Sequence, residues 1–374
     1  MRIAFHRHAR GPLSRAEGVW DRTRFAVKNR LGLVEPPIVI PYRGFGDATR
    51  YWLKGRVLED PGISQEAAEH SLRQNLWLTY KRYETDEVPD ARLAWRFGER
   101  SGEVTTDEEG YFETTIEPGG AHDTGRAWQA VEVELLDSPV RGTRPHLARA
   151  MVRTPGRDAS FGIISDIDDT IVETGATNLV RHWRTVIANS AQTRVAFPGL
   201  AAFYRGLVGP GERNPVFYVS SSPWNLFDLF ERFLHLRGIP HGPMLLKDFG
   251  LTQTRWLTGG HHGHKSEMIE TILAAYPALR FILIGDSGQR DAFIYRDIAK
   301  AHPGRIAAIY IREIKGGRHH ALVEEALEEA RGLGVDTACG DDLWVAAEHA
   351  AERGWLGEEH LETVRRDVKR DEAA

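Results

Sequence analysis

The chain has 374 residues, of which 41% are hydrophobic and 27% are charged, with a formal net charge of −5 at pH 7. This length allows two domains with separate cores, and the composition is that of a soluble globular protein. The acidic balance argues against a dedicated nucleic-acid binder, which is usually basic.

The location of the protein is constrained by what the sequence lacks. Cys339 is the single cysteine, so the chain cannot form an intramolecular disulfide, and this is compatible with a reducing cytoplasm. The first residues, MRIAFHRHAR, contain no apolar segment of signal-peptide length, and no run of 18 apolar residues occurs. We therefore expect a cytoplasmic protein, and the ten tryptophans leave a peripheral contact with a membrane surface open.

The first part of the chain is expected to be a helix followed by a β-domain. Residues 1–35 contain apolar residues at helical spacing and are assigned to an N-terminal helix. From 36 to 153, apolar and polar residues mostly alternate, as in YWLKGRVL, ARLAWRF, GYFETTI and AVEVELL. This pattern is typical of half-buried strands and predicts a small antiparallel, sandwich-like accessory domain. Residues 64–83 read as a helix inserted among these strands.

The pattern changes beyond the linker RTPGRDAS to alternating strands and helices. The near-continuous apolar runs FGIIS, PVFYVS, FILIG and RIAAIYI are typical of parallel strands that are covered on both faces. Helical stretches separate them, including LVRHWRTVIA, LAAFYRGL, WNLFDLFERFLHLRG, KSEMIETILAAY and IYRDIAKAH. We predict a doubly wound parallel sheet of Rossmann-like type over 154–320 and C-terminal helices packed on it over 321–374.

Acidic and hydroxyl side chains follow three of these apolar runs. Because ligands bind beyond the carboxyl ends of the strands in doubly wound sheets, these side chains are expected to converge on one edge. A helix is expected to begin at Lys265, after the polar loop HHGH, and to bring its N-terminus to the same edge. The expected site residues are Asp166, Asp168, Thr170, Ser220, Ser221, Trp224, Lys265, Asp286 and Asp291.

This set of residue types suits phosphoryl transfer. Carboxylates such as Asp166 and Asp286 are the hard ligands that Mg²⁺ prefers. A carboxylate can also attack phosphorus and form an aspartyl-phosphate. Asp168, two residues after Asp166, is placed to protonate the leaving oxygen and then to activate water. The hydroxyl of Ser220 and the ammonium of Lys265 can bind phosphoryl oxygens.

The motifs DIDDT, the serine after the second strand, the lysine and GDSGQRD resemble those of the haloacid dehalogenase superfamily. Within it, SDIDDTI, YVSSSPWNL and FILIGDSGQRD resemble App-type phosphatidate phosphatase catalytic domains over about residues 155–320. The resemblance implies a haloacid dehalogenase-like fold, Asp166 as the nucleophile and Asp168 as the acid/base. It also implies a Mg²⁺ held by Asp166, the main chain of Asp168, Asp286 and Asp291, and conversion of phosphatidate to diacylglycerol.

Several alternatives stay open. The substrate is phosphatidate in one interpretation and a soluble or protein-bound phosphate ester in another, and a non-catalytic lipid- or phosphate-binding protein is the third. Lys247 competes with Lys265 for the phosphate, and Asp291 is either a metal ligand or an ordinary first-turn acid. Thr170, Ser221 and Trp224 are candidates for substrate contact, although a tryptophan at this position is more often a packing residue. Asp169 is expected to cap the following turn.

Overall fold

The computed structural model describes residues 34–60, 87–123, 125–168, 170–171, 197–247, 261–288, 290–314 and 320–372. The predicted helices at 64–83 and 179–188 and nearly all of the one at 1–35 lie outside these residues, as does Asp169. The chain divides into two compact units. The first comprises Met1–Thr154 with Asp248–Thr258, and the second Pro155–Lys247 with Gly259–Ala374.

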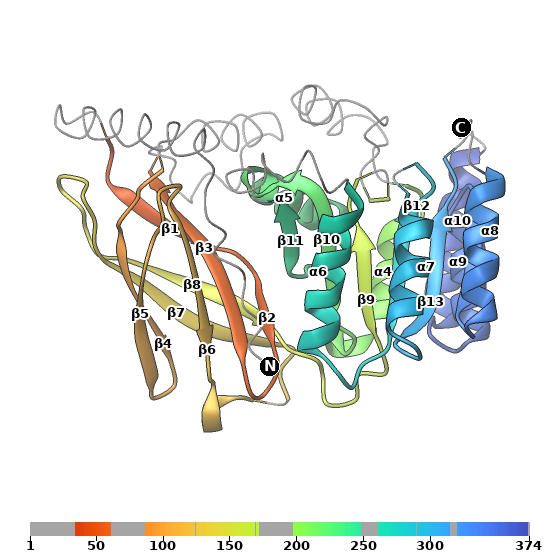
Figure 1. The fold of residues 1–374 in the computed structure, drawn as a ribbon, viewed down its shortest axis with the longest axis horizontal. Helices are drawn as coiled ribbons and strands as arrows, with labels where there is room; N and C mark the ends of the chain where they lie inside the picture. The colour runs from red at the N-terminus through yellow and green to blue at the C-terminus, as the bar shows by residue number, and fades with distance from the viewer. Residues whose placement is uncertain are drawn as a thin grey trace. The chain divides into compact units, whose positions relative to one another are not determined.

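The first unit is an eight-stranded sheet in the order β1-β3-β2-β8-β7-β4-β5, with β6 paired to β3 (Figure 1). Its strands are β1 (Pro37–Pro41), β2 (Gly44–Gly46), β3 (Tyr51–Glu59), β4 (Arg92–Phe97), β5 (Arg100–Thr105), β6 (Tyr111–Ile116), β7 (Trp128–Asp137) and β8 (His146–Arg153). A short 3-10 helix, Gly119–Ala121, follows β6. The pairs are antiparallel except for β2 and β8, which run parallel.

Alternation of side chains builds the core of this unit. In β7 the buried residues Val131, Val133 and Leu135 alternate with more exposed ones, as the period of two predicts. The strands form one hydrogen-bonded sheet, whereas the simplest sandwich has two separate ones. Strand β5 ends this order, and it contacts β6, which pairs with β3 near the other end, so the sheet folds back on itself around the apolar cluster.

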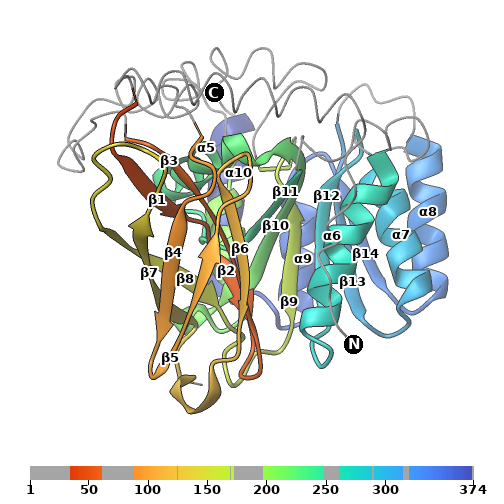
Figure 2. The same ribbon diagram turned by 60° about the vertical axis from the view of Figure 1, so that its left-hand side comes forward.

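The second unit contains a six-stranded parallel sheet in the order β11-β10-β9-β12-β13-β14, as Figure 2 shows. Its strands are β9 (Gly162–Asp166), β10 (Val216–Pro223), β11 (Met244–Lys247), β12 (Phe281–Asp286), β13 (Ile306–Arg312) and β14 (Asp336–Gly340). Every residue of β9 and β12 is buried, which explains their continuous apolar runs. The predicted parallel sheet and the separate, mainly antiparallel N-terminal sheet are thus confirmed.

Helices lie on both faces of the parallel sheet (Figure 1). They are α4 (Leu200–Val208), α5 (Phe227–Arg237), α6 (His261–Ala275), α7 (Asp291–Ala301), α8 (His320–Gly332), α9 (Trp344–Glu352) and α10 (Glu358–Glu372), with 3-10 turns at Pro210–Glu212 and Trp224–Leu226. Helices α6, α7 and α8 pack side by side, and α10 packs against α4 and α9. No helix in the described ranges is both long and apolar enough to cross a lipid bilayer.

The structure corrects two expectations about the second unit. Strands β11 and β14, at the two edges of the parallel sheet, were not predicted; Asp336–Gly340 is only partly buried and has no apolar run. Helix α6 begins at His261, so the sequence HHGH is its first turn and not a polar loop. The prediction that the helix starts at Lys265 is therefore wrong, because the residues of the first turn have neither apolar periodicity nor high helix propensity and gave no signal for a helix.

Candidate active site

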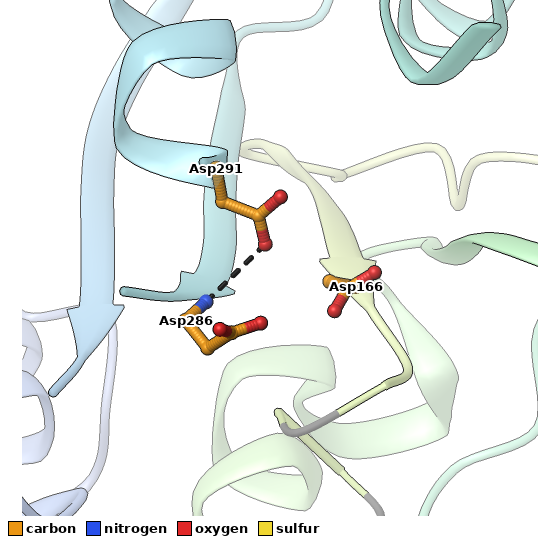
Figure 3. A group of neighbouring side chains, drawn as sticks. All are labelled: Asp166, Asp286 and Asp291. Atoms are coloured by element: carbon orange, nitrogen blue, oxygen red, sulfur yellow. Dashed lines mark hydrogen bonds between the residues drawn. The ribbon is translucent and has the colours of Figure 1, made fainter. Parts of the chain in front are cut away.

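Three buried carboxylates meet at the carboxyl ends of neighbouring strands. Asp166 is the last residue of β9, Asp286 is the last residue of β12, and Asp291 is the first residue of α7 (Figure 3). One carboxylate oxygen from each lies within 4.8 Å of those of the other two. All three residues are fully buried, so their mutual repulsion is weakly screened by water.

The turn between β12 and α7 fixes two of these carboxylates. The main-chain N–H of Asp286 donates to Oδ2 of Asp291 at 3.2 Å, and that of Gly288 donates to Oδ1 of Asp286 at 2.6 Å. A Cβ atom at position 285 would lie 2.3 Å from Oδ2 of Asp291, so this position requires glycine. Arg290, in the left-handed region with φ of 68°, redirects the chain into α7.

Lys265 supplies a buried positive charge to this group. Its Nζ lies 2.8 Å from Oδ1 of Asp166 and 2.5 Å from Oδ1 of Asp291. Burial by itself would lower the pKa of Lys265, but the two carboxylates outweigh it and raise the pKa, so the ammonium stays charged. Lys247, the other candidate, ends β11 opposite Pro223. The structure therefore favours Lys265 as the lysine of the site.

The ionisation of Asp166 is strongly perturbed by its surroundings. Burial raises its pKa well above the ordinary value, Lys265 opposes this, and the carboxyls of Asp291, Asp168 and Asp286 add to it. Its Oδ2 accepts a long hydrogen bond of 3.5 Å from the hydroxyl of Thr170, which is also buried. A cation bound by the three carboxylates would favour the ionised form of Asp166. The donor set, three hard oxygens, suits Mg²⁺.

Asp168 lies apart from the three carboxylates and contacts two serines of β10. Its Oδ2 accepts a hydrogen bond of 2.5 Å from Ser220. The hydroxyl of Ser222 lies 3.3 Å from each carboxyl oxygen. Ser222 was not among the expected site residues, since a run of three serines carries no periodic signal. What distinguishes Ser222 is its contact with Asp168, which lies in the segment just after β9.

The structure gives less direct support to the two remaining predicted site residues, Ser221 and Trp224. Ser221 is half-buried between Ser220 and Ser222 on β10. Trp224 is buried and stacks on Phe227, with ring centroids 6.3 Å apart, which favours the packing role. Substrate contact by Ser221 and Trp224 thus stays a prediction.

Buried tyrosines support the main chain beneath the site. The hydroxyl of Ser165 donates to the main-chain oxygen of Asp166 at 2.7 Å and lies 2.6 Å from the hydroxyl of Tyr204. The Tyr295 hydroxyl donates to the main-chain oxygen of Ile284 at 2.9 Å. Burial raises the pKa of both tyrosines, so both phenols remain neutral donors that hold β9 and β12 in place.

A parallel sheet with buried acids, a lysine and hydroxyls at its carboxyl edge defines an α/β protein with a polar site at the strand ends. Residues 161–313 match the family described as the catalytic domain of phosphatidate phosphatase APP1. This match confirms the resemblance to App-type catalytic domains that the motifs indicated.

Two curated proteins are similar to the chain. Phosphatidate phosphatase APP1 of Saccharomyces cerevisiae is 33% identical over 178 residues, which cover 47% of this chain and 30% of the yeast protein. The uncharacterized protein C29B5.04c of Schizosaccharomyces pombe is 27% identical over 257 residues, which cover 67% of this chain and 40% of that protein. The chain therefore spans less than half the length of both relatives.

The solved structures that align with the chain are only weakly similar to it. A carbohydrate acetylesterase from Xanthomonas citri aligns with a TM-score of 0.28 and 11% identity over 88% of this chain and 74% of its own. A mutant of the PilB minor pilin from Streptococcus sanguinis aligns with a TM-score of 0.27 and 10% identity over 94% of this chain and 98% of its own. These scores are too low to relate the folds.

Proposed function

We propose that the chain is a Mg²⁺-dependent phosphatase that hydrolyses a phosphomonoester through an aspartyl-phosphate on Asp166, with phosphatidate as substrate and diacylglycerol as product. The observation that carries this proposal is the buried group of three carboxylates around Lys265, inside the segment that matches App-type catalytic domains. The haloacid dehalogenase-like, doubly wound fold belongs to the same proposal. It is supported by the strand order, in which the chain leaves β9 toward β10 and later returns to β12 on the other side.

The metal would be held by Asp166, Asp286 and Asp291, with the main-chain oxygen of Asp168 as a further ligand. When bound, Mg²⁺ supplies positive charge that neutralises the phosphoryl oxygens. Lys265 lies against Asp166 and Asp291, so its ammonium is placed to add to that charge. The positive charges of Lys265 and of a bound metal would offset the cost of placing three carboxylates in a buried site.

Two carboxyl groups share the chemistry of the proposed reaction: Asp166 bonds to phosphorus, and Asp168 transfers the protons. In the first half of the reaction, an oxygen of Asp166 forms a bond to phosphorus while the bond from phosphorus to the leaving oxygen breaks. Asp168 gives its proton to that leaving oxygen. In the second half, Asp168 takes a proton from water, the water oxygen bonds to phosphorus, and the bond between Asp166 and phosphorus breaks. Inorganic phosphate leaves and both carboxyls return to their first state.

The lipid substrate is supported by the matched family and the name of the yeast relative. The segment between Ile171 and Pro215 leaves room for only a small cap over the site, and residues 172–196 of it lie outside the described residues. A shallow cap would admit the headgroup of a membrane lipid, and a cytoplasmic protein that contacts the membrane surface would meet it there. The same chemistry would act on a soluble or protein-bound phosphate ester.

Phosphate release from phosphatidate vesicles tests the proposal. We expect release by wild type in Mg²⁺, none with a chelator, and a loss of about a thousandfold or more in Asp166→Asn. Asp297→Asn is the control for the same chemical change, because the Asp297 side chain is exposed on α7, and this variant should leave the rate unchanged. Equal rates for wild type and Asp166→Asn would reject the phosphatase. Turnover of only sugar or peptide phosphates in a parallel panel would reject the lipid, and vesicle binding without any turnover would favour a binding protein.

A further inference from the structure

The Asp168 carboxyl is held by two serines from the same strand. The hydroxyl of Ser220 donates to Oδ2 of Asp168 at 2.5 Å, and the hydroxyl of Ser222 lies 3.3 Å from both Oδ1 and Oδ2. The main-chain N–H of Ser222 donates to Oγ of Ser220 at 2.8 Å. All three side chains are buried, so these hydrogen bonds are made away from bulk water.

A count of protons shows a conflict at Ser220. A serine hydroxyl has one proton to donate, and in this structure that proton is directed at Asp168. The expected role of Ser220 is to donate to a phosphoryl oxygen, which requires the same proton. While Asp168 is ionised, as it is after it has given its proton to the leaving oxygen, Ser220 therefore cannot donate to the phosphoryl group and to Asp168 at the same moment. When Ser220 turns to the substrate, Asp168 loses the shorter of its contacts with the two serines, and such a loss is costly for a buried carboxyl.

Ser222 resolves this conflict. Its hydroxyl already lies within reach of both oxygens of Asp168, and its main-chain N–H fixes Ser220 beside it. The hydroxyl group can donate to an ionised carboxylate and accept from a protonated one, so it can remain bonded to Asp168 in both protonation states. Both states are needed, since Asp168 acts first as an acid and then as a base.

We infer that Ser222 is a positioning residue that holds the acid/base Asp168 while Ser220 binds the transferring phosphoryl group. The inference rests on the proposed function, because it assigns a part to Ser222 within that reaction. Ser222 acts through its contact with Asp168. Its removal should therefore affect the proton-transfer steps and leave the binding of the phosphate ester nearly unchanged.

A double-mutant cycle on kcat and KM, with short-chain phosphatidate in detergent micelles, tests this inference. We expect Ser222→Ala to lower kcat by about ten- to a hundredfold with KM changed by less than about twofold. Asp168→Asn should lower kcat further, and adding Ser222→Ala to it should cause almost no additional loss. Ser222→Thr retains the hydroxyl and should recover most of the kcat. Ser160→Ala, the same change at an exposed side chain, is the control.

The outcomes separate the inference from the proposed function. Losses that multiply in the double variant, a rise in KM at constant kcat, or a Ser222→Thr variant as slow as Ser222→Ala would each overturn the role of Ser222 while the phosphatase stands. A wild type that releases no phosphate would overturn the proposed function and the inference with it. Thermal unfolding of each variant identifies any loss of kcat that comes from misfolding.

Discussion

Lys265 and Asp291 lie 2.5 Å apart, Nζ to Oδ1, although 26 residues separate them in the sequence. Since Nζ is also 2.8 Å from Asp166, a single ammonium links the start of α7 to the end of β9. Without this ammonium, no lysine among the described residues would lie between these buried carboxylates to offset their mutual repulsion. The geometry of Asp166, the proposed nucleophile, therefore depends on a residue contributed by α6.

We first predict that Lys265→Met impairs both activity and folding. Removal of one partner from a buried ion pair typically lowers the free energy of unfolding by about 3–5 kcal/mol. Loss of a cation aimed at the transferring group should lower kcat by about a hundredfold or more. Urea unfolding and phosphate release measure the two effects. Lys300→Met, on the exposed pair with Glu329, should change neither appreciably; a Lys265→Met enzyme with wild-type kcat would contradict the role of Lys265.

We next predict that Gly285→Ala displaces Asp291. The added Cβ would lie 2.3 Å from Oδ2 of Asp291 and 2.7 Å from its Cβ, so the carboxylate must move. Overpacking of this kind costs about 1–3 kcal/mol, and we expect kcat to fall with it. Gly332→Ala is the matched control, because a Cβ there meets no heavy atom within 4 Å. If the two variants have the same thermal unfolding temperature and the same kcat, the close contact between position 285 and Asp291 does not constrain the site.

Much of this arrangement could be predicted from the sequence, for a physical reason. Strands such as β9 and β12 are buried on both faces, so their apolar runs are continuous and their carboxyl ends mark the site. Asp166 and Asp286 follow from that rule without any contact information. Their placement within 4.8 Å of Asp291 could be expected from adjacency of the strands, but the pairing of Lys265 with two acids could not.

What the sequence did not reveal lacks a local signal. Strand β14 lies at the sheet edge and needs no continuous apolar run. The first turn of α6 contains three histidines and a glycine, which have low helix propensity, so the sequence gives no local signal for the start of the helix there. Ser222 differs from Ser221 in its contact with Asp168, and this contact joins residues 54 positions apart. Such distant contacts are not encoded in any short pattern.

A third prediction concerns metal affinity. Asp286 contributes a buried oxygen to the acidic group but is not the proposed nucleophile, so Asp286→Asn separates metal binding from covalent chemistry. We expect it to weaken binding of Mn²⁺, a spectroscopic substitute for Mg²⁺, by more than about tenfold. Electron paramagnetic resonance titration of the free ion measures this without turnover. If Asp286→Asn binds Mn²⁺ as tightly as wild type and Asp297→Asn do, the metal is bound elsewhere.

A fourth prediction concerns pH and the first unit. Nδ1 of His146, on β8, accepts a hydrogen bond of 3.2 Å from the main-chain N–H of Val39, on β1, which requires this nitrogen to be unprotonated. Burial lowers the pKa of His146, although Asp60 opposes this. The folded pKa is thus below the unfolded value of about 6.5, so the unfolded state binds more protons as pH falls. The stability from the neutral ring is present above about pH 6.5 and is lost as pH falls through the folded pKa.

Urea unfolding midpoints between about pH 5 and pH 8 measure this effect. We expect His146→Gln, which can still accept a hydrogen bond but does not titrate, to show a shallower loss of stability at low pH than wild type. Burial also lowers the pKa of His122, so part of the slope should remain. An identical pH dependence in wild type and His146→Gln would contradict the role of His146.

The most direct test of the central claim is to look for the phosphoryl group on Asp166 itself. Protein mixed with phosphatidate labelled in its phosphate and quenched in acid should retain label in Mg²⁺, and hydroxylamine should release it, as expected for an acyl phosphate. Peptide mapping should place the label on Asp166, and Asp166→Asn or chelated wild type should carry none. Phosphate release with no label on Asp166, and at an undiminished rate in Asp166→Asn, would contradict the account.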